Sequence, residues 1–406
     1  MLQLESIDPR SFGKRIVEAR KARGVTQKEV AEFLGCSRPT YIAIEKGERP
    51  LNPDEVRKIA SFLGQRVHEL VRPAEPVVDL QPHLRAVVGK IRAADEQQLY
   101  AGIDELQRFA EDYRELERLA NAQLPYNYPP TVELGGRIDP AQLAESISVR
   151  ERQRLGLGDQ PVSNLRSLLE LDVGLRIFYG VLPSNIAGMY AYTTDLGCCI
   201  LINRNHPAEK RRASMLHEYG HLIVDRYQPG IDYLTFPGRK PANERFAEQF
   251  SLCFLMPTSS VHKRFQEIVT TTGDFQVGDL CRLSHFYFVS VEAMALRLEQ
   301  LGLMPRGTWQ ALMESELAPR KAQEMLELPS QPISSDPFSK RYTFLAVQVF
   351  EQAKISQGQL ARFLRCDPLS AREIVAECRA SLQIEESGVS RQLELPFDRS
   401  LLDDQR

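Results

Sequence analysis

The segment "RRASMLHEYGHLIVDRY" (residues 211–227) contains two histidines four positions apart and a glutamate directly after the first. An α-helix turns about 100° per residue, so His217 and His221 project from one face and can bind one metal ion. Glu218 is turned to the side, where its carboxylate can take a proton from a metal-bound water. Apolar residues flank the motif, so the helix is expected to pack in a core, where unpartnered histidines would be costly. The segment therefore predicts a buried helix that carries part of a metal site.

A second helix downstream offers the remaining ligand. The segment "ANERFAEQFSLCFLMP" (242–257) places Glu244 and Glu248 one turn apart on one face. If this helix crosses the histidine helix, one carboxylate can bind the metal and the other can hold the second ring nitrogen of a histidine. We predict Glu244 as the ligand and Glu248 as the supporting group, although helical spacing leaves the choice between them open. Two histidines and one glutamate leave a fourth position open, as a catalytic Zn²⁺ site requires.

A small sheet is expected ahead of the histidine helix. The run "LRIF" (175–178) predicts one strand, and "GMYAYTTDLGCCILINRN" (188–205) predicts two more around a turn at 195–197. A helix is expected over 140–156. The adjacent Cys198 and Cys199 lie in an apolar strand, so we interpret them as core residues rather than as a redox sensor.

The N-terminal stretch "GVTQKEVAEFLGCSRPTYIAIEKGERPLNPDEVRKIASFLG" (24–64) has the rhythm of a helix-turn-helix. Thr26 and Glu29 predict a capping box, Gly35 ends the first helix, and Ser37 caps the second. The second helix of such a unit enters the major groove of DNA. The first 74 residues carry fourteen Lys/Arg against ten Asp/Glu, although the whole chain has a net charge of −3. The residues expected to contact DNA are Gln27, Lys28, Ser37, Arg38, Thr40, Lys46 and Arg49.

The overall composition indicates a soluble protein. Apolar residues make up 43% and charged residues 26% of the 406 positions. No apolar run reaches the length of a membrane span, and the N-terminus lacks the features of a signal peptide. The seven cysteines are scattered without a CxxC pair, so we expect a reduced, cytoplasmic protein.

Both motif regions resemble known families. Residues 24–64 resemble the Xre/lambda-repressor-like family through the pattern "TQ..VA..LG.S...Y...E.G.R", with Pro39 as a departure near the start of the second helix. Residues 140–258 resemble the ImmA/IrrE (DUF955) metallopeptidases through "LGLGDQPVSNLRSLLELDVGLRIF", "ILIN", "HEYGH" and "ERFAEQFSLCFLMP". That resemblance implies His217, His221 and Glu244 as zinc ligands and Glu218 as the general base. It leaves Glu248 as a departure, because the family usually has Asn there.

These resemblances imply an α+β, mostly α, fold in four regions. A lambda-repressor-like helix-turn-helix DNA-binding domain is expected over 1–72, a linker and long helical segment over 73–137, a zincin-like zinc metallopeptidase domain with a small sheet over 138–260, and a helical C-terminal region with a polar tail over 261–406. In the long segment, Leu99, Ile103, Leu106 and Phe109 recur at helical spacing and indicate a packing or dimerisation face. Residues 355–375 loosely echo the N-terminal helical pair, and we interpret them as a small bundle rather than a second DNA reader.

Two functions fit these features. The first is a transcriptional regulator with an active zinc endopeptidase, which cleaves an Xre-type repressor or itself in a stress or mobile-element response. The Pro-rich stretch 71–82 is a candidate self-cleavage site, because an extended chain can add as a strand beside "ILIN". The second is a transcription factor whose peptidase-like domain is a non-catalytic sensor or partner-binding module, an antitoxin-like role included. Both imply a double-stranded DNA operator as partner and no membrane. Both also imply a homodimer, because such readers usually bind paired half-sites.

Overall fold

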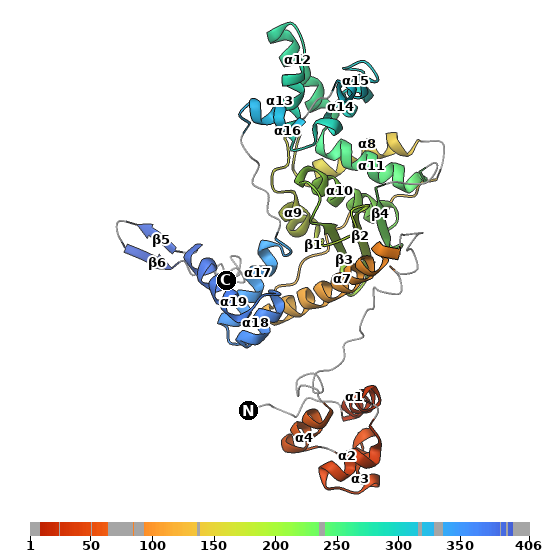
Figure 1. Cartoon of the computed structure of the whole chain (residues 1–406), viewed down its shortest axis with the longest axis vertical. Helices are drawn as coiled ribbons and strands as arrows, with labels where there is room; N and C mark the ends of the chain where they lie inside the picture. Colours follow the sequence, from red (N-terminus) through yellow and green to blue (C-terminus); the bar gives the residue numbers. More distant parts are fainter. Residues whose placement is uncertain are drawn as a thin grey trace, which may run out of the picture. The chain divides into compact units, whose positions relative to one another are not determined.

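The computed structural model describes residues 9–23, 25–49, 51–63, 84, 93–135, 139–234, 240–315, 319–328, 336–381, 383–386 and 389–392. The chain divides into two compact units, Met1–Val78 and Asp79–Arg406 (Figure 1). Within the described ranges, no helix combines the length and the apolar character needed to span a bilayer. The predicted linker and self-cleavage stretch, 71–82, lies outside the described residues.

The first unit is a bundle of four described helices: α1 (Pro9–Ala22), α2 (Gln27–Leu34), α3 (Arg38–Glu45) and α4 (Pro53–Leu63). The predicted caps are confirmed. Thr26 and Glu29 form a capping box, and Gly35 has a φ of 70°. The Ser37 side chain accepts the backbone N–H of Thr40 at the start of α3. The apolar faces of all four helices meet in one core that includes Ile16, Val30, Ile44, Val56 and Ile59.

The second unit is built on a four-stranded sheet in the order β1-β3-β2-β4. The strands are β1 (Arg176–Gly180), β2 (Ile186–Thr193), β3 (Gly197–Asn203) and β4 (Gly230–Tyr233). β1 runs parallel to β3, whereas β2 is antiparallel to both β3 and β4. The "ILIN" residues belong to β3, which has a neighbour on each side. The expectation that an extended chain adds beside "ILIN" is therefore wrong, because that strand has no free edge.

Helices cover both faces of the sheet (Figure 1). On one face lies α10 (Ala208–Val224), backed by α8 (Pro140–Arg154) and α11 (Ala242–Leu255). On the other lies α7 (Ala93–Ala120), whose Phe109 ring stacks on Phe178 of β1 at 5.0 Å. Leu99, Ile103, Leu106 and Phe109 are all buried. This stripe therefore packs inside its own unit. It is a packing face and not a dimerisation face.

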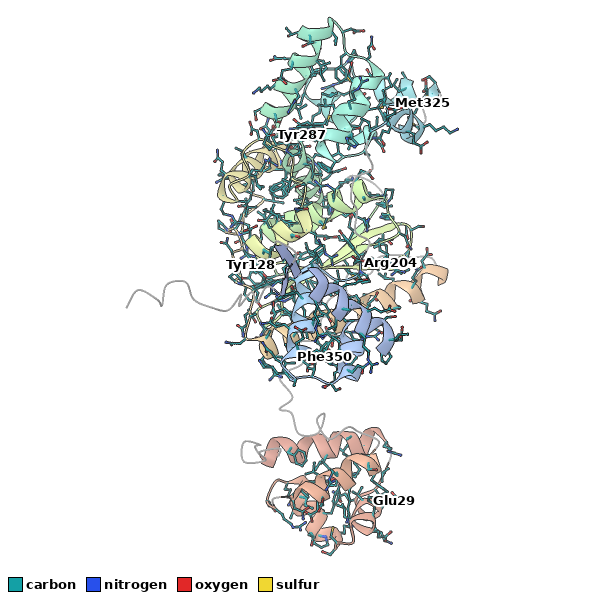
Figure 2. All side chains as sticks on the ribbon, turned by 90° about the vertical axis from the view of Figure 1, so that its left-hand side faces the viewer. Glu29, Tyr128, Arg204, Tyr287, Met325 and Phe350 are labelled. Atoms are coloured by element: carbon teal, nitrogen blue, oxygen red, sulfur yellow. The ribbon has the colours of Figure 1, made fainter. Side chains whose placement is uncertain are left out.

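The short helices of the second unit fall into two groups. Before the sheet come α9 (Leu165–Leu168) and a π-helical turn, η2 (Leu169–Val173). After α11 come α12 (Thr258–Thr272), α13 (Val277–Tyr287), α14 (Val291–Gln300), α15 (Thr308–Glu314) and α16 (Pro319–Met325). Tyr287, labelled in Figure 2, is fully buried. Its hydroxyl lies 2.6 Å from that of Ser260 on α12. Because Tyr287 and Met294 share one core with α10, that core continues past residue 260.

The chain then forms a C-terminal bundle of α17 (Lys340–Glu351), α18 (Gln357–Phe363) and α19 (Pro368–Ser381). A hairpin of β5 (Gln383–Glu386) and β6 (Val389–Gln392) follows where only a polar tail was expected. Arginines attach the bundle to α7: Arg341 pairs with Glu117 at 3.0 Å and Arg362 with Glu115 at 3.1 Å. The whole is the α+β, mostly helical architecture that the sequence predicts.

Candidate metal centre and nucleic-acid interface

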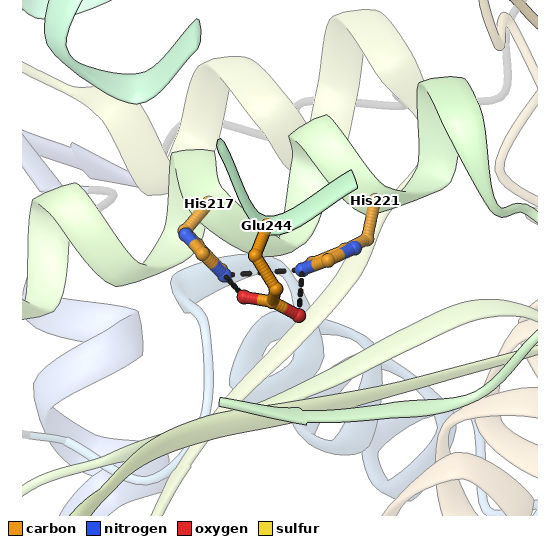
Figure 3. Close-up of side chains that lie close together, drawn as sticks. All are labelled: His217, His221 and Glu244. Carbon is orange, nitrogen blue, oxygen red and sulfur yellow. Dashed lines mark hydrogen bonds and ion pairs between the residues drawn. The ribbon is translucent and has the colours of Figure 1, made fainter. Parts of the chain in front are cut away.

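His217 and His221 of α10 and Glu244 of α11 converge on one point (Figure 3). The two Nε2 atoms are 3.0 Å apart. The Glu244 oxygens lie 3.3 Å from Nε2 of His217 and 3.4 Å from Nε2 of His221. Zinc bonds of about 2.0–2.1 Å in a tetrahedron place ligand atoms about 3.3 Å from one another. The donor types and their spacing therefore fit a zinc ion held by two imidazoles and one carboxylate.

Close contact between α10 and α11 brings Glu244 to the histidines. A Cβ added at Gly220 would lie 2.8 Å from Cα of Ala247, so only glycine allows the helices to approach this closely. Ala247 lies three residues after Glu244, and the crossing point therefore sets where the carboxylate arrives. The contact between Gly220 and Ala247 was not predicted from the sequence, although a glycine inside a helical motif is a signal of close packing.

Glu218 is fully buried beside the cluster. Neither of its carboxylate oxygens has a hydrogen-bond partner among the described residues. A Cβ at Gly188 of β2 would lie 3.0 Å from Oε1, so the absence of a side chain there makes room for this carboxylate. Burial, reinforced by the nearby charge of Asp232, raises the pKa of Glu218 well above its ordinary value. A buried carboxylate without a partner is costly, and a metal-bound water would satisfy it.

The structure does not bring Glu248 to the histidines. Its exposed carboxylate pairs with Lys240 at 2.8 Å. Asp225 takes the expected supporting place instead, with Oδ2 3.5 Å from Nδ1 of His221. Asp225 follows His221 by four residues, so the same helical spacing that revealed the two histidines could have revealed it.

The pKa values of the cluster reflect these contacts. Burial would lower the pKa of His221, but the carboxylates of Asp225 and Glu244 outweigh it and raise that pKa to about 10. Burial would raise the pKa of Glu244, but both histidines hold it well below its usual range. A metal ion must therefore compete with a proton for this site.

A further carboxylate enters from the sheet. Oδ1 of Asp232 on β4 lies 3.8 Å from Nε2 of His217. Asp232 pairs across the sheet with Gly188, the residue that makes room for Glu218. Asp232 was not predicted from the sequence, because β4 has only four residues and no recognisable alternation.

The residues expected to contact DNA lie at the N-terminal ends of α2 and α3 and in the turn after α3. Lys28, Ser37, Arg38 and Lys46 are exposed, whereas Gln27, Thr40 and Arg49 are half-buried. Some already have protein partners. The Gln27 amide donates to Glu45 at 2.8 Å and accepts from Arg38 at 3.3 Å.

Two of the remaining contacts are intramolecular as well. Arg49 pairs with Glu55 at 2.9 Å, so a phosphate would have to replace that carboxylate. The hydroxyls of Ser37 and Thr40 lie 2.7 Å apart at the start of α3. Both still lie where helix N–H groups favour an anion.

Two known families match this chain, one in each of its two compact units. Residues 16–70 match a helix-turn-helix family, and residues 172–299 match the M78 peptidase family, described as the IrrE N-terminal-like domain. The cryptic phage CTXphi transcriptional repressor RstR of Vibrio cholerae is 34% identical over 85 residues, which cover 21% of this chain and 75% of that protein.

Two solved structures align over most of the chain. ComR from Streptococcus suis is 10% identical, covers 92% of this chain and 95% of its own, and has a TM-score of 0.15. PlcR of Bacillus thuringiensis, in complex with the peptide PapR7 and DNA, is 9% identical, covers 91% and 98%, and has a TM-score of 0.17. At such TM-scores these likenesses carry no argument about the fold.

Proposed function

We propose that this chain, which belongs to the DNA-binding helix-turn-helix regulators fused to an IrrE-like M78 peptidase domain, is a transcriptional regulator with zinc-dependent endopeptidase activity. Its substrate would be an Xre-type partner repressor or the chain itself, in a stress or mobile-element response. The single observation that carries the proposal is the buried carboxylate of Glu218, which has no hydrogen-bond partner among the described residues and lies beside three donors spaced for zinc. A purely structural metal site is closed by its ligands and needs no additional carboxylate beside them.

The chemistry follows from the placement of these side chains. His217, His221 and Glu244 would hold the ion, which when bound polarises a peptide carbonyl and acidifies a water. Burial raises the pKa of Glu218, and the positive charge of a bound ion would favour the carboxylate form that takes the proton of the attacking water. The same carboxyl then delivers that proton to the leaving amine.

β4 stands at the end of the sheet, and its outer edge pairs with no other strand among the described residues, which supports a binding mode for the substrate. An extended peptide can add to this edge through backbone hydrogen bonds. Because the Asp232 side chain reaches to 3.8 Å from His217, a strand added to β4 would pass next to the cluster. This edge replaces the position beside "ILIN" as the proposed substrate site.

The DNA-binding unit would bring this activity to an operator. Phosphate contacts from the α2 and α3 termini position such a unit, and side chains at the start of α3 read base edges. The similarity to a phage transcriptional repressor fits this role. We further propose that the chain acts as a homodimer, because such units usually bind two half-sites.

The test combines metal analysis with a proteolysis assay. Purified wild-type protein should contain stoichiometric zinc, and Glu218→Gln should keep the zinc and lose all cleavage. Cleavage products are sought by N-terminal proteomics in cells that express either form. Absence of zinc from the wild-type protein would contradict the proposal. A Glu218→Gln strain that regulates normally would favour the alternative of a non-catalytic sensor or partner-binding domain.

A second metal analysis tests the ligand assignment. Glu244→Ala should lose zinc, whereas Glu248→Ala should retain it, because the Glu248 carboxylate pairs with Lys240 instead. Metal loss in Glu248→Ala alone would reverse the assignment of the third ligand.

A further inference from the structure

Tyr190, a fully buried residue of β2, lies directly against one of the proposed metal ligands. Its ring is parallel to the imidazole of His221, with centroids 5.8 Å apart and an interplanar angle of 8°. A flat ring in this position restricts rotation of the imidazole about its side-chain bonds. The side chain of Tyr190 thus contacts the face of His221, while the edge that carries Nε2 points to Glu244.

The Tyr190 hydroxyl holds the turn that follows the metal helix. The carbonyl oxygens of Asp225, at 2.5 Å, and of Gln228 both lie within hydrogen-bond distance of this hydroxyl, whose single O–H is donated to one of them or shared between the two. These carbonyls lie in the turn just beyond the end of α10, where the Asp225 carbonyl also accepts the backbone N–H of Gln228 at 2.8 Å. The same turn carries the Asp225 carboxylate that faces Nδ1 of His221. One hydroxyl therefore anchors the support of the histidine's second nitrogen.

Tyr190 also contacts the start of the edge strand. It pairs across the sheet with Gly230, the first residue of β4. A Cβ at Gly230 would lie 3.0 Å from Cε1 of the Tyr190 ring, so the ring covers this backbone closely. The metal ligand and the proposed substrate edge thus have a common support.

We propose that Tyr190 is a positioning residue that holds His221 and the Asp225 turn in the metal-binding geometry before zinc arrives. Groups that orient a ligand in this way typically contribute 10–100-fold to metal affinity. The inference rests on the zinc site of the proposed function, but it does not depend on peptidase turnover.

A buried tyrosine can also act only as a core residue, and the two roles make different predictions. Loss of packing alone destabilises the metal-free and zinc-bound forms equally, so the rise in melting temperature caused by zinc stays the same. Loss of positioning weakens zinc binding, so that rise becomes smaller. Zinc affinity and zinc-induced stabilisation therefore separate the two roles.

The experiment uses the full-length protein with Tyr190→Phe, Tyr190→Leu and the matched control Tyr287→Phe. Tyr287 is equally buried, and its replacement by Phe also removes a hydroxyl contact, the one with Ser260. This contact lies on α12 and α13, outside the proposed zinc ligands. The zinc dissociation constant is measured by competition with a chelator, and melting is followed with and without zinc. Tyr190→Phe should weaken zinc binding about tenfold and Tyr190→Leu about a hundredfold. Tyr287→Phe should lower both melting temperatures and leave the dissociation constant unchanged.

Two results would overturn the inference, and they are distinguishable. If both Tyr190 variants bind zinc as tightly as the wild type, Tyr190 is a core residue and the proposed metal site stands. If the wild-type protein itself does not bind zinc, the proposed function fails together with this inference. Tyr190→Phe keeps the ring and nearly the same volume, so it tests the hydroxyl even if Tyr190→Leu does not fold.

Discussion

Helices α2 and α3 of the first unit resemble helices α18 and α19 of the second in their helix caps and in the turn between the two helices. Each first helix opens with a capping box, formed by Thr26 and Glu29 in one unit and by Ser356 and Gln359 in the other. In the turn that follows, one residue adopts a positive φ in each case. The equivalent positions are Thr26 and Ser356, Gln27 and Gln357, Ala31 and Ala361, Phe33 and Phe363, Gly35 and Arg365, Cys36 and Cys366, and Ser37 and Asp367.

The two helix pairs differ in the charges on their surfaces. Ser37 caps α3 with a neutral hydroxyl, whereas the Asp367 carboxylate accepts the N–H groups of Leu369 and Ser370 at the start of α19. A carboxylate thus lies at the N-terminus of α19. In a DNA-binding helix-turn-helix, the N-terminus of the equivalent helix would face a phosphate. Gly358 also stands where the first unit has the exposed Lys28.

The arginines of the C-terminal bundle serve a different purpose. Arg362 and Arg365 pair with carboxylates of α7, and Arg341 pairs with Glu117 of the same helix. Similar caps and periodicity therefore support a DNA-reading surface in one unit and a bundle packed on α7 in the other. Local patterns therefore specify the scaffold, while the placement of charge decides what the scaffold binds.

The largest expected effect concerns the carboxylate that anchors the C-terminal bundle. Glu117 is fully buried between Arg176, at 2.6 Å, and Arg341. Glu117→Ala leaves the buried Arg176 without its counter-charge and should cost about 3–5 kcal/mol of unfolding free energy. Urea denaturation of the full chain measures this loss in the transition of the second unit.

The matched control for that variant lies in the first unit. Glu45 pairs with Arg20 at 2.6 Å and is also mostly buried. Glu45→Ala should shift only the transition of the first unit, and Glu117→Ala only that of the second. A shift of both transitions by either variant would mean that the two units do not unfold separately.

The second prediction tests which helix pair binds DNA. Arg38→Ala should weaken binding to a mixed-sequence duplex by about 1–3 kcal/mol and reduce the slope of log affinity against log salt by about one. Arg372→Ala, in α19, should change neither quantity. Fluorescence anisotropy at several salt concentrations measures both. Weaker binding by Arg372→Ala would show that the C-terminal bundle also contacts DNA.

A third change makes the first helix pair resemble the second. Ser37→Asp keeps a side chain that can cap α3, so the melting temperature of the first unit should stay nearly constant. The new carboxylate would repel phosphate at the helix end, and DNA affinity should fall about tenfold, or about 1.4 kcal/mol. Ser37→Ala is the control: it should cost about 1 kcal/mol of stability and retain more of the DNA affinity. If Ser37→Asp and the wild type bind DNA equally well, the charge of the capping residue does not explain why one helix pair binds DNA and the other does not.

The smallest effect concerns pH and the contact between α18 and α7. Burial outweighs the attraction of Arg365 and Arg362 and raises the pKa of Asp112 to about 6. A carboxyl with a higher pKa in the folded than in the unfolded state binds its proton more tightly when folded. Its contribution to stability should therefore decrease as the pH rises from about 4 to about 6. Denaturation across this range should show a flatter profile for Asp112→Asn, and an unchanged profile would contradict the assignment.

Much of the fold was predictable because its signals are local. The capping residues of α2 and α3, the spacing of His217 and His221 and the short apolar runs of β2 and β3 on either side of a turn all depend on near neighbours in the sequence. The helix that carries Glu244 was also predictable from its apolar spacing. None of these signals reaches across the chain, so helical spacing left open whether Glu244 or Glu248 meets the histidines, and the family resemblance supplied the choice of Glu244.

Tertiary structure alone decided how the elements meet. Both Glu244 and Glu248 lie on one face of α11, and the close crossing at Gly220 and Ala247 brings only Glu244 to the histidines. The stripe on α7 predicted burial, but the sheet that covers it lies more than fifty residues further along the chain.

The sequence by itself determined the two helical motifs and the donor types of the metal site. The four-residue strand β4, the approach of Asp232 to His217 and the support of His221 by Tyr190 became visible only in the folded chain. The physical reason is the sequence separation over which each interaction acts. Helix and strand periodicities come from backbone geometry over a few residues, whereas a metal site needs side chains from separate elements to meet within a few ångströms.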